Sequence, residues 1–124
     1  MSTNLTTVPP TTTVAEAATL MASRHIGSAL VCEGDELAGI FTERDIVRAL
    51  SQDFGAPSEP LETWMTRDPK TVGPDADVRE CLDIMVQRGF RHLPVTEGSK
   101  VVGIVSIRDL SRALSEESGT GRSG

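Results

Sequence analysis

A twelve-residue segment occurs twice in this chain. GIFTERDIVRAL at residues 39–50 returns as GIVSIRDLSRAL at residues 103–114, which is 64 positions later. Both copies keep a glycine, a hydroxyl residue, an Arg-Asp pair and a closing Ala-Leu. The same shift aligns residues 7–50 with residues 71–114 without a gap. Because a repeat at fixed spacing marks a repeated structural unit, it constrains the fold more than any other feature of the sequence.

The length sets how the two copies must be organised. The chain has 124 residues, and half of that is close to the lower limit of about 60 residues for a domain that folds alone. We therefore expect the copies to pack on each other as a pseudo-twofold pair. The expected boundaries are repeat 1 at 1–52, a Gly- and Pro-containing linker at 53–64, repeat 2 at 65–116 and a disordered tail at 117–124.

Each copy predicts the order β-α-β-β-α, which makes the chain an α/β protein. Apolar residues recur at i, i+3, i+4 and i+7 in the first helix of each copy, and a Glu-Gly turn separates the strands of each hairpin. The expected strands are Leu5–Val8, Ser28–Cys32, Glu36–Phe41, Lys70–Val72, Leu93–Thr96 and Lys100–Val105. The expected helices contain Val14–Met21, Glu43–Ser51, Val78–Met85 and Ile107–Ser115, with a short turn at Leu61–Met65; Thr12 or Thr13 and Asp75 or Asp77 are the candidate N-caps.

The lead-in to the second copy is an asymmetry. Pro60–Trp64 precedes repeat 2, and the 64-residue shift would place its counterpart before Met1. Two interpretations are open: the protein does without this segment, or the chain was cut from something longer.

Composition excludes several classes of function. The net charge of −6 and the pI near 4.8 argue against binding to nucleic acid or an anionic membrane, which needs a basic surface. No apolar run approaches the ~20 residues of a membrane helix, so we expect a soluble, cytoplasmic protein. Cys32 and Cys81 lack the spacing of a zinc site. No motif supplies a nucleophile with its base, so we expect no enzyme and no metal.

The repeated segment has two chemical interpretations. Thr42 with Asp45, and Ser106 with Asp109, have the spacing of capping boxes that satisfy the first amides of a helix. Gly39 would allow another backbone to approach its strand. Alternatively, a hydroxyl, a carboxylate and a guanidinium at a helix N-terminus suit a nucleotide: the carboxylate accepts from ribose hydroxyls, and the other groups favour phosphate.

The whole pattern resembles a tandem pair of CBS domains, the module named after cystathionine β-synthase. The resemblance covers nearly all of residues 1–115 and includes the doubled G-h-x-[S/T]-x-x-D phrase, HLPV at 92–95 and M-T-x-x-P at 65–69. It implies two clefts between the copies that bind an adenosine ligand such as AMP, ADP, ATP or S-adenosylmethionine. It also implies a homodimer formed through helices, for which the exposed parts of the helix faces bearing Met21 and Met85 are the expected contact.

The resemblance further implies which residues bind the ligand. Asp45 and Asp109 would hold the ribose hydroxyls, and the other positions would line the clefts or lie near adenine and phosphate: Thr7, Ile26, Gly27, Ser28, Thr42, Arg44, Thr71, Phe90, Arg91, His92, Ser106 and Arg108. Where repeat 1 has Gly27 and Ser28, repeat 2 has Arg91 and His92, so phosphate affinity is expected in the cleft that the latter pair faces.

The expected function is therefore a non-catalytic sensor of an adenine nucleotide that acts on a regulated protein partner. Two other interpretations remain. The chain is a ligand-free dimerisation or interaction module whose capping boxes are purely structural, or it is a regulatory fragment of a larger enzyme or transporter.

Overall fold

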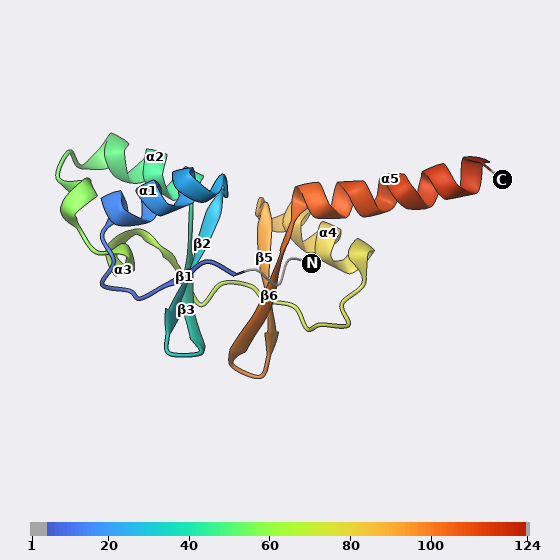
Figure 1. Ribbon diagram of the computed structural model, residues 1–124, viewed down its shortest axis with the longest axis horizontal. Coiled ribbons are helices and arrows are strands. Elements are labelled where there is room, and N and C mark those ends of the chain that lie inside the picture. Colours follow the sequence, from blue (N-terminus) through green and yellow to red (C-terminus); the bar gives the residue numbers. More distant parts are fainter. Residues whose placement is uncertain (1–4, 124) are drawn as a thin grey trace. The chain divides into compact units, whose positions relative to one another are not determined.

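The computed structural model describes the backbone of residues 5–123 and the side chains of residues 5–115. The fold is mixed α/β and divides into two compact units (Figure 1). Thr6–Pro69 form the first, called here the repeat-1 unit, and Leu5 together with the chain from Lys70 onward forms the second, the repeat-2 unit. The segment expected as a linker therefore packs within the first unit.

The repeat-1 unit is a small sheet with two helices and a returning linker. Its elements are β1 (Thr7–Val8), α1 (Val14–Arg24), β2 (Ser28–Glu33), β3 (Glu36–Thr42), α2 (Glu43–Gln52), the 3₁₀ turn η1 (Ala56–Ser58), α3 (Leu61–Trp64) and β4 (Thr66–Arg67). Strand β2 lies between β1, which is parallel to it, and β3, which is antiparallel. Strand β4 pairs antiparallel with the other side of β3. The order β1-α1-β2-β3-α2 and the helical turn α3 agree with the prediction, whereas η1 and β4 were not predicted.

The repeat-2 unit has the same plan with fewer elements. It contains α4 (Val78–Arg88), β5 (His92–Glu97), β6 (Lys100–Ser106) and α5 (Ile107–Ser123). Strands β5 and β6 form an antiparallel hairpin whose register matches that of β2 and β3, including a shift after the fourth pair. The two hairpins are thus structural copies, as the sequence repeat predicts.

Two elements differ from the expectation. The strand expected at Lys70–Val72 is a single bridge between Val72 and Val95. In repeat 1 the Leu30 amide donates to the Thr6 carbonyl, but the equivalent residue in repeat 2 is Pro94, which has no N–H to donate. Helix α5 runs to Ser123 rather than Ser115, through nearly all of the stretch expected to be disordered. Helix elongation adds one hydrogen bond per residue once the helix is nucleated, so this extension needs no apolar periodicity of its own.

The helix starts resolve the open choices of N-cap. The Thr13 hydroxyl accepts from the Glu16 amide, and the Glu16 carboxylate accepts from the Thr13 amide, which is a complete capping box. In the repeat-2 unit the Asp77 carboxylate caps α4 by accepting from the Arg79 amide at 2.8 Å. The two equivalent helices are therefore capped at equivalent positions by different side chains.

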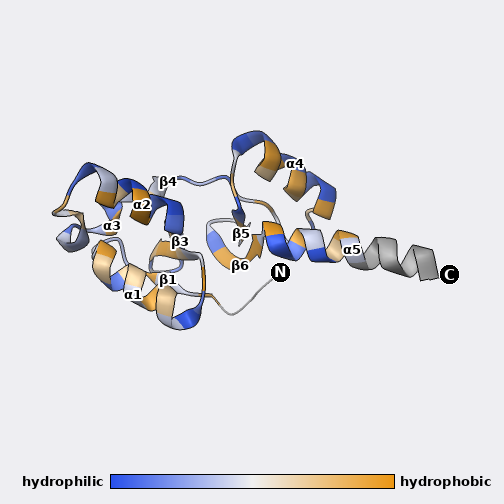
Figure 2. Cartoon of the chain, turned by 90° about the horizontal axis from the view of Figure 1, so that it is seen from above, coloured by the Kyte–Doolittle hydropathy of each residue, from blue (hydrophilic) through white to orange (hydrophobic). Residues whose placement is uncertain are grey.

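Each unit has its own apolar core. Met21, Phe41 and Leu61 are completely or almost completely buried in the repeat-1 unit, as are Met85 and Leu93 in the repeat-2 unit. In Figure 2, α4 carries both hydrophobic and hydrophilic residues, as expected of a helix with one buried face. Met21 and Met85 themselves are buried in their own units, so only the exposed parts of α1 and α4 could supply the helix contact of the expected homodimer.

The linker returns over the repeat-1 unit and is held there by backbone hydrogen bonds. The Leu61 amide donates to the Thr12 carbonyl at 2.8 Å, and the Val14 amide donates to the Glu59 carbonyl at 3.0 Å. Leu61 is fully buried and Trp64 is 8% exposed. The linker thus completes the core of the first repeat rather than merely connecting two domains.

Gly39 tests how closely the linker packs. A Cβ atom at this position would lie 2.6 Å from the Thr66 carbonyl oxygen and 2.7 Å from the Met65 sulfur. We predict that Gly39→Ala lowers the free energy of unfolding by about 1–3 kcal/mol through overpacking. Trp64 is the one tryptophan of the chain, so its fluorescence during urea unfolding follows this unit.

Gly73→Ala is the matched control for this prediction. No atom lies within 4 Å of a Cβ built on Gly73, so this variant should unfold at the same urea concentration as the parent protein. Because Gly73 belongs to the repeat-2 unit, circular dichroism follows the unfolding of this variant. Equal stability of the Gly39→Ala and Gly73→Ala variants would contradict the close approach of the linker.

Candidate functional site

The junction between β3 and α2 brings predicted site residues together in repeat 1. Ser28 at the start of β2 pairs with Thr42 at the end of β3. The Glu43 amide donates to the Gly27 carbonyl at 3.1 Å, which holds the residues before β2 beside the first turn of α2. Gly27, Ser28, Thr42 and Asp45 therefore lie in one small region.

Repeat 2 builds the same junction between β6 and α5. His92 pairs with Ser106, and the Ile107 amide donates to the Arg91 carbonyl at 2.8 Å. These contacts gather Arg91, His92, Ser106 and Asp109 near the N-terminus of α5. Arg91 is exposed and His92 is half-buried, so both side chains are accessible to solvent.

The remaining predicted residues are less closely gathered. Ile26 and Phe90 are partly buried and pack against the cores of their units, which is a structural role. Thr7 is exposed on β1, beside Leu30 of β2. The other three are Thr71, which is half-buried just before the Val72 bridge, and Arg44 and Arg108, which are exposed on the first turns of α2 and α5.

Asp45 is buried, and both of its carboxylate oxygens accept hydrogen bonds. The residue is 7% exposed. Its Oδ2 accepts from the Thr42 amide at 3.0 Å and from the Thr42 hydroxyl at 3.2 Å, and its Oδ1 accepts from Nη2 of Arg48 at 3.4 Å. Because a buried carboxylate must have partners, these contacts give Asp45 a structural role.

Arg48 links Asp45 to the linker. The same Nη2 donates to the Trp64 carbonyl at 2.6 Å, and the guanidinium lies 5.5 Å from the centre of the Trp64 ring, within the range of a cation–π contact. The sequence prediction missed Arg48. The signal was present, since Arg48 and Arg112 are equivalent positions within the repeated twelve-residue segment.

Asp109 has the same capping geometry with fewer partners. Its Oδ2 accepts from the Ser106 amide at 3.1 Å, and its own amide donates to the Ser106 hydroxyl at 3.1 Å. No hydrogen bond within the described part of the chain reaches its Oδ1. The residue is half-buried, so this oxygen remains open to a ligand donor.

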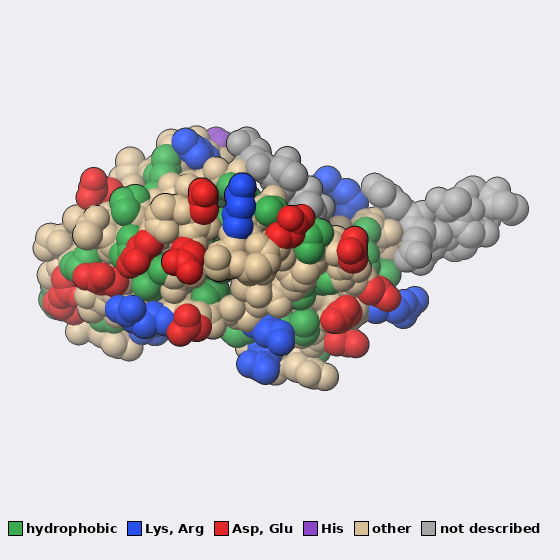
Figure 3. Space-filling model, turned by 90° about the horizontal axis from the view of Figure 1, so that it is seen from below, with side chains coloured by type: hydrophobic (Ala, Val, Ile, Leu, Met, Phe, Trp, Pro, Cys, Tyr) green, Lys and Arg blue, Asp and Glu red, His purple; other side chains and the backbone are tan. Residues whose placement is uncertain are grey.

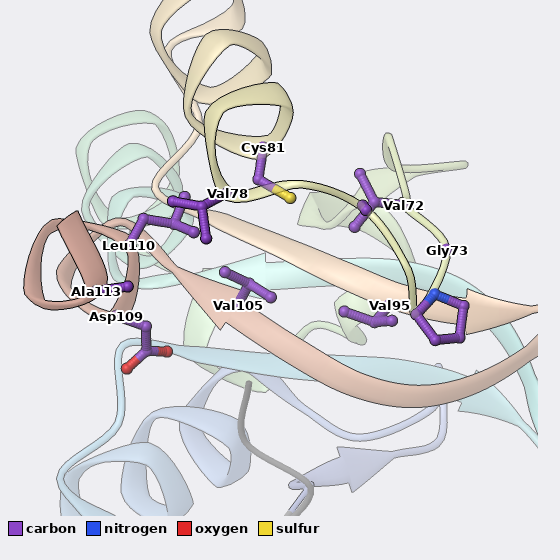
Figure 4. Close-up of a pocket in the computed structure, with 11 residues that line it drawn as sticks. Val72, Gly73, Val78, Cys81, Val95, Val105, Asp109, Leu110 and Ala113 are labelled. Atoms are coloured by element: carbon purple, nitrogen blue, oxygen red, sulfur yellow. The ribbon is translucent and has the colours of Figure 1, made fainter. Parts of the chain in front are cut away.

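An apolar pocket of about 170 Å³ lies beside Asp109 within the repeat-2 unit. Figure 4 shows side chains from α4, α5 and the hairpin converging on it, with Asp109 at its edge and the Cys81 sulfur directed toward Val72. The sequence prediction named only Asp109 of its lining. The rest are Val72, Gly73, Pro74, Ala76, Val78, Cys81, Val95, Val105, Leu110 and Ala113.

The pKa of each cysteine thiol is raised. Burial raises the pKa of the Cys81 thiol, and the nearby carboxylates of Glu80 and Asp77 raise it further. Burial and then Asp35 raise the pKa of Cys32 in the same way. Because the thiolate is the nucleophile, neither cysteine is activated at neutral pH.

Charged side chains and side chains of metal-binding types also occur elsewhere among the described residues. Acidic and basic side chains are interspersed on the face shown in Figure 3. Among the described residues, no group of three or more His, Cys, Asp or Glu side chains could hold a metal ion. In the same part of the chain, no helix is both long and apolar enough to cross a membrane.

The different engagement of the two aspartates predicts different effects on stability. Asp45→Ala removes the acceptor of the partly buried Thr42 amide and the ion-pair partner of Arg48, and should cost about 2–3 kcal/mol of unfolding free energy. Asp109→Ala removes a half-exposed cap and should cost about 1 kcal/mol. Urea unfolding followed by circular dichroism compares the two variants, and a larger loss for Asp109→Ala would contradict this assignment.

Comparison with known proteins assigns the chain to a family. The CBS domain family matches residues 1–52 and 61–116. An uncharacterized 17.7 kDa protein of Acidianus ambivalens is 47% identical over 116 residues, which are 91% of this chain and 69% of the relative. The CBS domain-containing protein CBSCBSPB1 of Arabidopsis thaliana is 41% identical over 103 residues, which are 82% of this chain but only 19% of that longer protein.

A solved structure gives the same fold. The CBS domain pair of protein MJ0100, in complex with 5′-methylthioadenosine and S-adenosyl-L-methionine, matches with a TM-score of 0.86 and 28% identity, over 94% of this chain and 93% of that one. The doubled junction, the matching hairpin registers and these likenesses lead to one conclusion: the chain belongs to the CBS domain family and contains two CBS repeats.

Proposed function

We propose that this chain is a non-catalytic regulatory module that binds an adenosine-containing ligand at its second repeat. Membership of the CBS domain family supports a regulatory role. The complex of the MJ0100 domain pair with 5′-methylthioadenosine and S-adenosyl-L-methionine supports an adenosine ligand, because both of those molecules contain adenosine.

We place the ligand at repeat 2 because Oδ1 of Asp109 accepts no hydrogen bond from the described residues. A ribose presents two hydroxyl donors, and an ionised carboxylate is an acceptor that can take such bonds. In repeat 2 one carboxylate oxygen has no partner among the described residues, whereas in repeat 1 Arg48 and Thr42 hold both oxygens of Asp45. Binding at Asp45 would first have to break its hydrogen bonds to Thr42 and its ion pair with the partly exposed Arg48.

The cations around Asp109 favour a ligand that carries phosphate. Arg91 lies beside the α5 N-terminus through its backbone, and Arg108 occupies the first turn of that helix. Guanidinium groups and helix amides both stabilise phosphate oxygens, and they disfavour the positively charged sulfonium group of S-adenosylmethionine. Of the four expected ligands, AMP, ADP and ATP therefore fit this surface best.

The ligand need not enter the apolar pocket. At about 170 Å³ the pocket is smaller than the ~300–1,000 Å³ typical of sites that enclose a drug-sized ligand. The ligand is thus placed over the junction of Arg91, His92, Ser106 and Asp109. A regulatory effect further requires a protein partner, or a second copy of the chain in a homodimer, whose contacts differ between the free and bound states.

A second candidate function is a ligand-free interaction module. The observation in its favour is that Asp45 and Asp109 both take part in reciprocal caps with Thr42 and Ser106. Such caps explain the repeated segment without a ligand. The two functions make opposite predictions for ligand binding.

Calorimetric titration with AMP, ADP, ATP and S-adenosylmethionine tests the proposal. We predict binding of about one nucleotide per chain. Asp109→Asn should weaken it roughly 10- to 150-fold, because a hydrogen bond to a charged group contributes about 1.5–3 kcal/mol. Asp83→Asn is the matched control, since Asp83 is exposed on α4 of the same unit and the substitution removes the same charge.

Two results would contradict the proposal. If the folded protein binds none of the four ligands, the repeated segment is a pair of helix caps and the interaction module is favoured. If Asp109→Asn and Asp83→Asn bind with the same affinity, Asp109 does not hold the ligand.

A further inference from the structure

We propose that Arg112 is a further ligand-binding residue, whose guanidinium donates a hydrogen bond to the ribose hydroxyl that Asp109 holds. This inference deepens the proposed function and rests on it, because it concerns the same site of repeat 2. It follows from a comparison of the two repeats. Repeat 1 shows what an arginine at this position of the repeated segment does when an oxygen acceptor lies within its reach.

Arg48 bridges two oxygen acceptors in repeat 1. Its Nη2 donates to Oδ1 of Asp45 at 3.4 Å and to the Trp64 carbonyl at 2.6 Å. The side chain of the arginine is 44% exposed and that of the aspartate is 10% exposed, so the bridge forms at the surface of the unit. An arginine at this position therefore reaches both Oδ1 of the aspartate and a second oxygen beside it.

Arg112 occupies the same position in repeat 2. Arg48 is the sixth residue of α2, and Arg112 is the sixth residue of α5. Both helices begin directly after the second strand of their hairpins, and the registers of the two hairpins match. Arg112 also follows Asp109 by three residues, as Arg48 follows Asp45, and residues at this spacing are neighbours on a helix surface. Arg112 is consequently within reach of Oδ1 of Asp109.

The donor and the acceptor of this bridge are both available in repeat 2. Arg112 is exposed, and no hydrogen bond or ion pair within the part of the chain whose side chains are described engages its guanidinium. The cap at Ser106 uses Oδ2 of Asp109, which leaves Oδ1. A guanidinium donor and a carboxylate acceptor thus lie one helical turn apart beside the predicted ligand.

A ribose hydroxyl fits between these two groups because it is both a donor and an acceptor. Its proton is donated to Oδ1 of Asp109, and its oxygen accepts from the Arg112 guanidinium. The hydroxyl oxygen then has the place that the Trp64 carbonyl oxygen has beside Arg48 in repeat 1. Since only Oδ1 is available, one of the two ribose hydroxyls makes both of these bonds.

A direct ion pair between Arg112 and Asp109 is the competing arrangement. Such a pair on an exposed helix surface is weak, because water and salt screen both charges. A hydroxyl that inserts between the two groups leaves each of them with a hydrogen-bond partner. The ion pair is therefore no barrier to the ligand, and the arginine adds to its affinity.

Calorimetric titration of the full chain with AMP measures the contribution of Arg112. Arg112→Gln should weaken the binding of AMP about tenfold, because a hydrogen bond from a charged donor is lost. Arg79→Gln is the matched control, since Arg79 is exposed on α4 of the same unit and the substitution removes the same charge. This control should bind AMP within about twofold of the parent chain.

Analogues that lack one hydroxyl separate a direct contact from a general effect of charge. The probes are 2′-deoxy-AMP and 3′-deoxy-AMP, each of which keeps the phosphate and one ribose hydroxyl. For the analogue without the hydroxyl held at Oδ1, Arg112→Gln should bind within about twofold of the parent chain. For the other analogue the difference of about tenfold should persist. This comparison is a double-mutant cycle, which isolates the pairwise interaction.

Stability tests whether Arg112 is engaged by the chain itself. Arg112→Gln should unfold at the same urea concentration as the parent chain, whereas Arg48→Gln should unfold at a lower one, because Arg48 contacts the linker. A similar loss of stability in both variants would mean that a segment of the chain, such as one preceding Leu5, supplies the acceptor for Arg112. That result would overturn the proposal.

Two binding results would also overturn it. In one, Arg112→Gln and Arg79→Gln bind AMP equally well. In the other, the loss caused by Arg112→Gln is the same for AMP and for both analogues, so that the arginine acts on the phosphate or through its charge alone. If the parent chain binds none of the three nucleotides, the proposed function itself fails and this inference fails with it.

Discussion

The hydrogen bond from Arg48 to the Trp64 carbonyl, at 2.6 Å, determines how the two repeats of this protein differ. It joins α2 to the linker and, through the same guanidinium, engages the carboxylate of Asp45. A buried carboxylate needs such partners, and the linker supplies the fixed position from which Arg48 acts. In repeat 1 the linker therefore packs against the unit, and both carboxylate oxygens of Asp45 accept hydrogen bonds.

Repeat 2 has the same sequence plan without this interaction. Arg112 stands in the place of Arg48, but no described residue takes the place of Trp64. Asp109 is half-buried, so water can solvate its second oxygen and the fold does not require a protein partner for it. Among the described residues, no segment makes the hydrogen bonds in repeat 2 that the linker makes in repeat 1. The second oxygen of Asp109 and the apolar pocket beside it are therefore left accessible by the described part of the chain.

The sequence predicted most of the fold because the relevant signals were local and doubled. Apolar periodicity located α1 and α4, Glu-Gly turns located both hairpins, and the hydroxyl–aspartate spacing predicted the caps at Thr42 and Ser106. The wrong predictions involve longer-range effects. The strand at Lys70–Val72 is a single bridge, since Pro94 of the neighbouring strand has no N–H to donate to Lys70. The helical turn predicted at Leu61–Met65 is present as α3, but its packing was not predicted, because it depends on hydrogen bonds to the distant loop before α1.

The candidate site was predicted only in outline for the same reason. The resemblance to CBS domains ranked Asp45 and Asp109 as equals, because the repeated segment is the same at both positions. Their environments differ through Trp64 and Arg48, which lie outside the G-h-x-[S/T]-x-x-D motif. The pocket lining was missed because its residues belong to α4, α5 and the hairpin and, taken singly, appear as ordinary core positions.

We propose that the second repeat binds the adenosine ligand, whereas the equivalent aspartate of the first repeat is engaged by Thr42 and Arg48. The most direct test is a nuclear magnetic resonance titration of the assigned backbone amides with AMP. The account predicts that the amides of His92 and Ser106–Asp109 shift and saturate together, while those of Thr42–Asp45 stay near their free positions. Equal shifts at both junctions, or shifts confined to Thr42–Asp45, would contradict it.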